Sequence, residues 1–95
     1  MSPELKKSLK VRAHSLKPVV ITGQSGLTDA VIKEIDLALA HHELIKVRMN
    51  ASDREERAEM SRTACEATSA ALVQSIGHVV TLYRKRPENQ TDKKR

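Results

Sequence analysis

Hydrophobic positions recur at helical spacing near the start of the chain. Leu5, Leu9 and Ala13 stand at i, i+4 and i+8, and lysines fill the positions on the other side. The preceding Ser2-Pro3-Glu4 offers a capping serine, a proline for the first helical position and an acid for the first turn. The pattern predicts a short amphipathic helix with a basic outer face. It should end before Pro18, because the residue before a proline avoids helical geometry.

A β-branched run, a glycine turn and a second helical pattern follow. Residues 18–22 read Pro-Val-Val-Ile-Thr, which predicts a buried strand that stops at Gly23. The turn spans Gly23 to Gly26. From Thr28, a suitable N-cap, apolar residues keep helical spacing, and one stripe is formed by Val31, Ile35, Ala38 and His42.

Strict alternation marks the next strand, over residues 43–49. Leu44, Lys46 and Arg48 fall on one face, whereas Ile45, Val47 and Met49 fall on the other. This predicts one buried face and one open, partly basic face. Ser52-Asp53-Arg54-Glu55 fits a capping box and predicts a helix to about Thr68, with small residues on its inner side.

Two more β-rich runs complete the pattern. Residues 72–76 and 79–83 flank Gly77-His78 and predict a two-stranded hairpin. The whole order is an N-terminal helix followed by β-α-β-α-β-β, an α/β chain of the two-layer α+β kind with a mixed four-stranded sheet. Right-handed crossovers would place both later helices on one face of the sheet. We expect a single domain over residues 1–86 and a basic polar tail over 87–95 that is disordered when free.

Charge and aromatic content then narrow the class of partner. The 95 residues carry a net charge of +5, with +4 in residues 1–20, −3 in residues 21–45 and +3 in residues 66–95. Basic ends of this kind suit a polyanion binder, although a basic surface can also serve solubility alone. Tyr83 is the single aromatic residue. A nucleic acid would therefore be held through phosphates, sugars or shape, with Tyr83 packed on the sheet or stacked on one base.

Other classes of function find little support. No apolar run is long enough for a membrane span, and the N-terminus lacks an apolar secretory segment, so a soluble cytoplasmic protein is expected. His41 and His42 are neighbours, and their side chains diverge on a helix, so we expect them to form neither a metal site nor an acid-base pair. We expect His42 to be partly packed. Cys65 is expected to be a small buried hydrophobe. We therefore expect no catalytic residue, no metal, no cofactor and no small-molecule substrate.

The Gly23–Gly26 turn has two interpretations. Glycines between a strand and a helix let a phosphodiester backbone come close, and the helix directs free N–H groups towards it, as in loops that clamp nucleotides. The same two glycines would also suit a purely structural turn. Dinucleotide and P-loop motifs need more glycines or a Gly-Lys-Ser/Thr ending, and neither is present.

Three sequence blocks resemble the CRM domain (chloroplast RNA splicing and ribosome maturation), above all its single-domain bacterial YhbY-like members. They are Leu16-Lys17-Pro18-Val19-Val20-x-x-Gly23-x-x-Gly26-Leu27-Thr28, His41-His42-Glu43-Leu44-Ile45-Lys46-Val47-Arg48 and Ile76-Gly77-x-x-x-x-Leu82-Tyr83-Arg84. The resemblance implies a fold like the C-terminal domain of translation initiation factor 3. It also implies RNA binding and association with precursors of the large ribosomal subunit.

The family's functional positions map onto the loop, onto the basic strand at Lys46 and Arg48, and onto Arg84. Many relatives carry a basic residue or asparagine inside the loop, where this chain has Gln24-Ser25, and Ser69 replaces a frequent glycine. The candidate RNA-binding set is Gly23, Gln24, Ser25, Gly26, Lys6, Lys10, Lys17, Lys46, Arg48, Arg84 and Lys85.

The expected partner is ribosomal RNA or a pre-large-subunit particle, bound by a chain that is monomeric when free. A duplex-DNA binder and a basic protein-interaction module are the alternatives.

Overall fold

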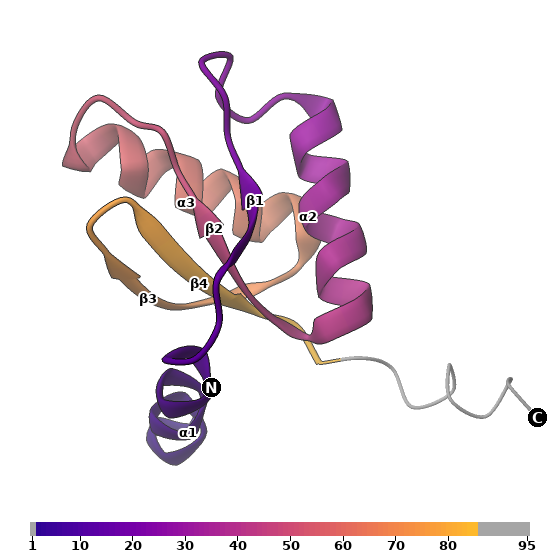
Figure 1. Cartoon of the computed structure of the whole chain (residues 1–95), viewed down its shortest axis with the longest axis vertical. Helices are drawn as coiled ribbons and strands as arrows, with labels where there is room; N and C mark the ends of the chain where they lie inside the picture. Colours follow the sequence, from indigo (N-terminus) through magenta and orange to yellow (C-terminus); the bar gives the residue numbers. More distant parts are fainter. Residues whose placement is uncertain (1, 86–95) are drawn as a thin grey trace, which may run out of the picture.

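The computed structural model describes residues 2–85, as three helices and a four-stranded mixed sheet (Figure 1). The predicted element order is confirmed. The predicted tail over 87–95 lies outside the described residues. The elements are α1 (Pro3–Ala13), β1 (Pro18–Ile21), α2 (Asp29–His42), β2 (Leu44–Arg48), α3 (Arg54–Thr68), β3 (Ala71–Ile76) and β4 (Val79–Tyr83).

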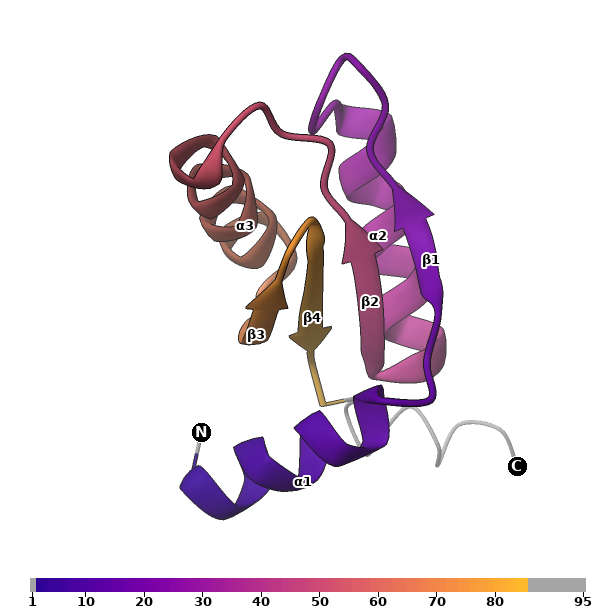
Figure 2. The same cartoon turned by 60° about the vertical axis from the view of Figure 1, so that its left-hand side comes forward.

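The sheet has the order β1-β2-β4-β3, with β1 parallel to β2 and the other neighbours antiparallel. Helices α2 and α3 cover the same face, as the crossover rule predicted (Figure 2). The main core lies between these two layers. It joins Ile35 and Leu39 of α2, Met60 and Ala64 of α3, and the inward residues of the strands, among them Val47.

Helix α1 packs against the opposite face of the sheet, at one end only. Leu9 and Ala13 of α1 are fully buried against Leu44 of β2 and Val73 of β3. Ser2 caps the helix as predicted, because its Oγ accepts a hydrogen bond of 3.1 Å from the N–H of Leu5. The rest of this face is not covered by a described helix and forms the open face of the sheet. Its residues are Pro18, Ile21, Lys46, Arg48, Gln74, Ile76, Val79 and Thr81.

The prediction that β1 is buried was wrong for most of the strand. Val20 is buried in the core, but Val19 and Ile21 are 52% and 63% exposed. The physical reason is the strand order, because β1 lies at the edge of the sheet and only one of its faces meets α2. In addition, the pairing of β1 with β2 is irregular at Val19, between the pairs Pro18–Lys46 and Val20–Val47.

Helix α3 begins one residue later than the predicted capping box. Asp53, not Ser52, is the N-cap, and its carboxylate accepts from the N–H of Glu56 at 2.8 Å. The Glu56 carboxylate in turn accepts from the N–H and the hydroxyl of Ser52, at 2.7 and 2.6 Å. These two hydrogen bonds lower the pKa of Glu56.

Three further positions differ from expectation or carry strain. His42 is exposed rather than packed, and Cys65 is half-buried rather than buried. Partial burial, with the nearby Glu66 charge adding to it, raises the pKa of the Cys65 thiol. At the end of α3, Ser69 takes a left-handed conformation with φ of +58° while its N–H donates to the Cys65 carbonyl.

Candidate nucleic-acid interface

The Gly23–Gly26 loop is a tight turn that projects beyond the end of β1, at the opposite end of the strand from α1 (Figures 1 and 2). The N–H of Gly26 donates to the carbonyl of Gly23 at 3.1 Å, which closes the turn. Gly26 has φ of +75°, a conformation that favours glycine. Thr28 then caps α2 by accepting from the N–H of Val31 at 3.2 Å, as predicted.

Gly23 is not required by the fold in the way that Gly26 is. Its φ is not in the left-handed region, and a Cβ placed on it would meet no atom within 4 Å. An alanine would therefore fit this position without strain or clash. The absence of a side chain at Gly23 matters only to something that approaches the loop from outside.

Arg48 lies directly beside this loop. It is the register partner of Ile21, and its carbonyl accepts from the N–H of Thr22 at 3.0 Å. Its side chain is exposed on the open face. The rigid parallel pair of β1 and β2 therefore holds a cation next to the base of the loop.

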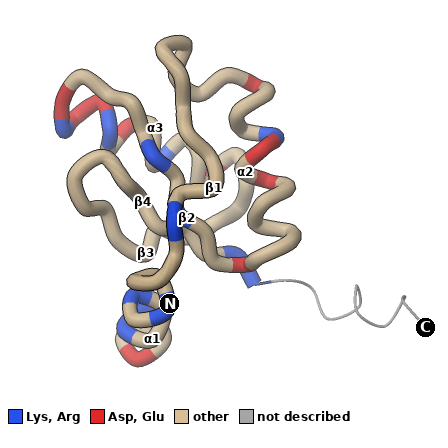
Figure 3. The backbone as a smooth tube through the Cα atoms, in the orientation of Figure 1, with Lys and Arg blue, Asp and Glu red and all other residues tan. Residues whose placement is uncertain are grey.

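Lys46 and Lys17 continue the positive charge away from the loop. Lys46 is the register partner of Pro18, the neighbour of Lys17, and Figure 3 shows basic residues along this strand. The Nζ of Lys46 donates to the Leu16 carbonyl at 3.2 Å, so this lysine also ties the segment after α1 to β2. We call Lys17, Lys46 and Arg48 the basic track.

A groove of about 290 Å³ lies beside the track on the open face. It is lined by Lys46 of β2 and by Val79 and Thr81 of β4, with His14 and Pro18 before them in the chain and Gln74 and Ile76 on the edge strand β3. The sequence reasoning did not select Gln74 or Ile76. The alternation along β3 was the available signal, but an irregularity between Leu72 and Gln74 shifts it.

Lys6 and Lys10 stand on α1, and the structure does not bring them next to the loop (Figures 1 and 2). Lys6 is exposed and Lys10 is half-buried. They extend the basic surface on the same side of the sheet, because α1 packs on the face that carries the track. Lys85, also exposed, follows the end of β4.

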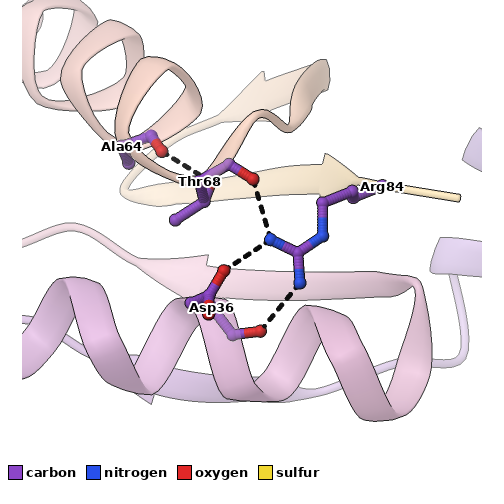
Figure 4. Close-up of polar contacts among 4 residues, drawn as sticks. All are labelled: Asp36, Ala64, Thr68 and Arg84. Atoms are coloured by element: carbon purple, nitrogen blue, oxygen red, sulfur yellow. Dashed lines mark hydrogen bonds and ion pairs between the residues drawn. The ribbon is translucent and has the colours of Figure 1, made fainter. Parts of the chain in front are cut away.

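Arg84 has a role inside the fold (Figure 4). Its guanidinium donates to the Asp36 carboxylate at 2.5 Å, to the Asp36 carbonyl at 3.1 Å and to the Thr68 carbonyl at 2.8 Å. These bonds join the end of β4 to both α2 and α3. The side chain is only 24% exposed, and all of these partners lie away from the open face.

Other kinds of site are not seen in the described part of the chain. No group of three or more histidine, cysteine, aspartate or glutamate residues among residues 2–85 could hold a metal ion. Within the same residues, no helix has the length and apolar character needed to cross a membrane.

The arrangement of loop, strands and helices agrees with a known family. A family model described as the CRS1 / YhbY (CRM) domain matches residues 1–84. The chain belongs to the CRM domain family. The expected family resemblance is thereby confirmed.

Several CRM domain relatives resemble the chain over nearly its whole length. A protein of Haemophilus influenzae named "RNA-binding protein" is 48% identical over 84 residues, which are 88% of this chain and 85% of the relative. A Pseudomonas aeruginosa relative, whose name gives RNA binding as probable, is 41% identical over 93% of this chain and 85% of its own.

The fold also matches a solved structure. A Staphylococcus aureus protein, described as a candidate RNA-binding protein and solved in solution, superposes with a TM-score of 0.82 at 35% identity. The match covers 94% of this chain and 93% of that one.

Proposed function

We propose that this CRM domain protein binds RNA, with the Gly23–Gly26 loop against the sugar-phosphate chain and the basic track neutralising phosphates. The observation that carries the proposal is the position of Arg48. Its backbone is hydrogen-bonded to the residue that precedes the loop, and its exposed side chain shares the open face with Lys46. A backbone that approached the loop would therefore meet a cation fixed to the same two strands.

The loop supplies the second part of the argument. Gly23 leaves the backbone of the loop without a side chain, although the fold would accept one there. The loop also leads directly into α2, whose N-terminal end carries a partial positive charge. Gln24 and Ser25 add hydrogen-bonding side chains without charge, so most of the electrostatic attraction comes from the track.

The relatives support RNA as the class of ligand, since the Haemophilus influenzae protein is named "RNA-binding protein". The resemblance to YhbY-like proteins extends the proposal to precursors of the large ribosomal subunit, on which the protein would act as an assembly factor. Lys6, Lys10 and Lys85 are further candidate contacts at the α1 end of the molecule. Arg84 is better assigned to the stability of the fold, because its guanidinium is occupied by Asp36 and Thr68.

Affinity measured across a salt series with a single-stranded RNA oligonucleotide tests the phosphate contacts. Each contact should contribute a slope of about −0.7 in log affinity against log salt. Arg48→Gln should reduce the slope by about one contact and weaken binding. Lys33→Gln is the matched control, because it removes the same charge from α2 on the other side of the sheet. If both variants changed the slope equally, RNA binding would depend on the net charge of the protein and not on Arg48.

Crosslinking in cells, followed by sequencing of the attached RNA, tests the ligand itself. We expect precursor sequences of large-subunit ribosomal RNA to be enriched over mature ribosomal RNA. Enrichment of other RNA would refute the assembly role and leave RNA binding intact. A competition in which duplex DNA displaces RNA at equal phosphate concentration would instead support the DNA-binding alternative.

A further inference from the structure

A second groove lies on the opposite side of the sheet from the open face, between α3 and β3. It encloses about 620 Å³ and is lined by Arg54, Arg57, Ala58, Ser61, Arg62, Cys65, Leu72, Ser75 and Gly77. Leu72 and Ser75 are the register partners of Leu82 and Val80, both of which are buried in the core under the helices. The groove therefore lies on the helix-bearing side of the sheet, where α3 does not fully cover the edge strand.

The charges of α3 are sorted between two sides of the helix. Arg54, Arg57 and Arg62 line the groove. The acids Glu55, Glu59 and Glu66, at i, i+4 and i+11, form a separate stripe that does not line it. Arg62 forms an exposed ion pair with Glu59, whereas Arg54 and Arg57 make no ion pair within residues 2–85. The arginines of α3 thus lie along the groove.

The apolar lining of the groove and the free edge of β3 favour an extended peptide. Ala58, Cys65 and Leu72 provide apolar surface, and Leu72 is 42% exposed. Strand β3 ends the sheet order, so its outer edge has no strand partner among the described elements. An unpaired edge presents backbone N–H and C=O groups to which another strand can add.

We propose that this groove binds an acidic, extended segment of a partner protein by strand addition to β3. Alternate side chains of a strand lie about 7 Å apart. The arginines at 54, 57 and 62 are separated by about 4.5 and 7.5 Å along the helix axis. Two glutamates at alternate positions of the segment match the spacing of Arg57 and Arg62, and an apolar side chain at the next alternate position covers Leu72. An RNA strand would also meet the arginines, but it uses neither the strand edge nor the apolar surface.

Cys65 gives a direct readout, because it is the only cysteine and it lines the groove. The probe is the synthetic peptide Glu-Thr-Leu-Thr-Glu-Thr-Glu, with blocked ends, added to the full chain. We expect it to slow the reaction of Cys65 with a thiol reagent by about fivefold at saturation. A control peptide with proline in place of each threonine keeps the charge but lacks the corresponding N–H donors, and it should protect poorly.

Matched protein variants separate local from general attraction. Arg57→Glu should weaken the peptide by about tenfold, whereas Lys33→Glu, with the same change in net charge, should change its affinity less than about twofold. Arg48→Gln should leave peptide binding unchanged. Circular dichroism of each variant checks that α3 is intact, and Arg57→Lys should keep most of the affinity.

Several results would overturn the proposal. Equal protection by the proline peptide would exclude strand addition, and no protection by either peptide would exclude the site. Protection of Cys65 by an RNA oligonucleotide, with loss of that protection in Arg57→Glu, would assign the groove to nucleic acid. Amide shifts in the NMR spectrum confined to residues 54–65 and 71–77 would support the peptide site, whereas shifts over α1 would contradict it.

Discussion

The guanidinium of Arg84 lies between the carboxylate of Asp36 and the carbonyl of Thr68, although Asp36 is 48 positions away in the chain. The N–H of Arg84 also donates to the Glu43 carbonyl at 2.9 Å. One residue after the last strand thus joins β4 to the ends of both core helices. A basic residue near a basic C-terminus was assigned to RNA from the sequence, but its contacts are those of a structural brace.

Arg84→Ala should therefore lower the free energy of unfolding by about 1–2 kcal/mol, because it removes charge-assisted hydrogen bonds to the half-exposed Asp36 carboxylate and to the Thr68 carbonyl at the end of α3. Urea denaturation followed by circular dichroism measures this change. Lys85→Ala, at the exposed neighbouring position, should alter stability by less than about 0.5 kcal/mol. RNA affinity at a temperature where Arg84→Ala is folded should stay within about twofold of the parent chain. A large loss of affinity with normal stability would restore Arg84 to the RNA-binding set.

Ser69 should be replaceable by glycine with a gain in stability. Its φ of +58° costs a residue with a Cβ about 1 kcal/mol relative to glycine, so Ser69→Gly should raise the unfolding free energy by about that amount. Ala67→Gly, two residues earlier on the exposed side of α3, should instead lower it by about 1 kcal/mol. Thermal denaturation of the two variants should therefore give melting shifts of opposite sign. Two shifts of the same sign would contradict the strain at Ser69.

The sequence was sufficient for the element order and for the two-layer arrangement, because these follow from hydrophobic period and crossover handedness. It was not sufficient for burial in β1, since β-branched residues suit an edge strand as well as a central one. The cap of α3 was one residue off because Ser52-Asp53 and Glu55-Glu56 each offer two suitable residues. Only the backbone path decides which pair is used.

For the candidate site, the loop and the alternation in β2 were visible in the sequence, and the structure places Arg48 beside the loop as a consequence of strand pairing. The role of Arg84 was not visible, because it depends on contacts with residues far along the chain. The α3 groove was not selected either. Its signal was the sorting of arginines and glutamates around the helix, which has meaning only once β3 is placed beside it.

The Glu56 carboxylate should make part of the stability depend on pH. Its hydrogen bonds with Ser52 hold its pKa below the ordinary value in the folded state. A carboxyl with a depressed folded pKa stabilises the fold above its unfolded pKa, about 4.3 for glutamate, and this contribution is lost as the pH falls through the folded value. The parent chain should thus lose stability more steeply below about pH 4.3 than Glu56→Gln does. Urea midpoints between acid and neutral pH measure the difference, and parallel curves would show that the bonds to Ser52 have no net effect.

The two loop glycines should respond differently to the same substitution. Gly23→Ala introduces a methyl group into open space at an unstrained φ, so the unfolding free energy should change by less than about 0.5 kcal/mol. Gly26→Ala forces a Cβ onto a φ of +75° and should cost about 1–2 kcal/mol. If the loop contacts a sugar-phosphate chain, Gly23→Ala should weaken RNA binding in a fully stable protein, because the methyl group stands where the backbone approaches. Urea denaturation and RNA titration on both variants separate the two effects. Unchanged RNA affinity in Gly23→Ala would make the loop a structural turn and leave Arg48 and its neighbours on β2 as the whole of the interface at this end.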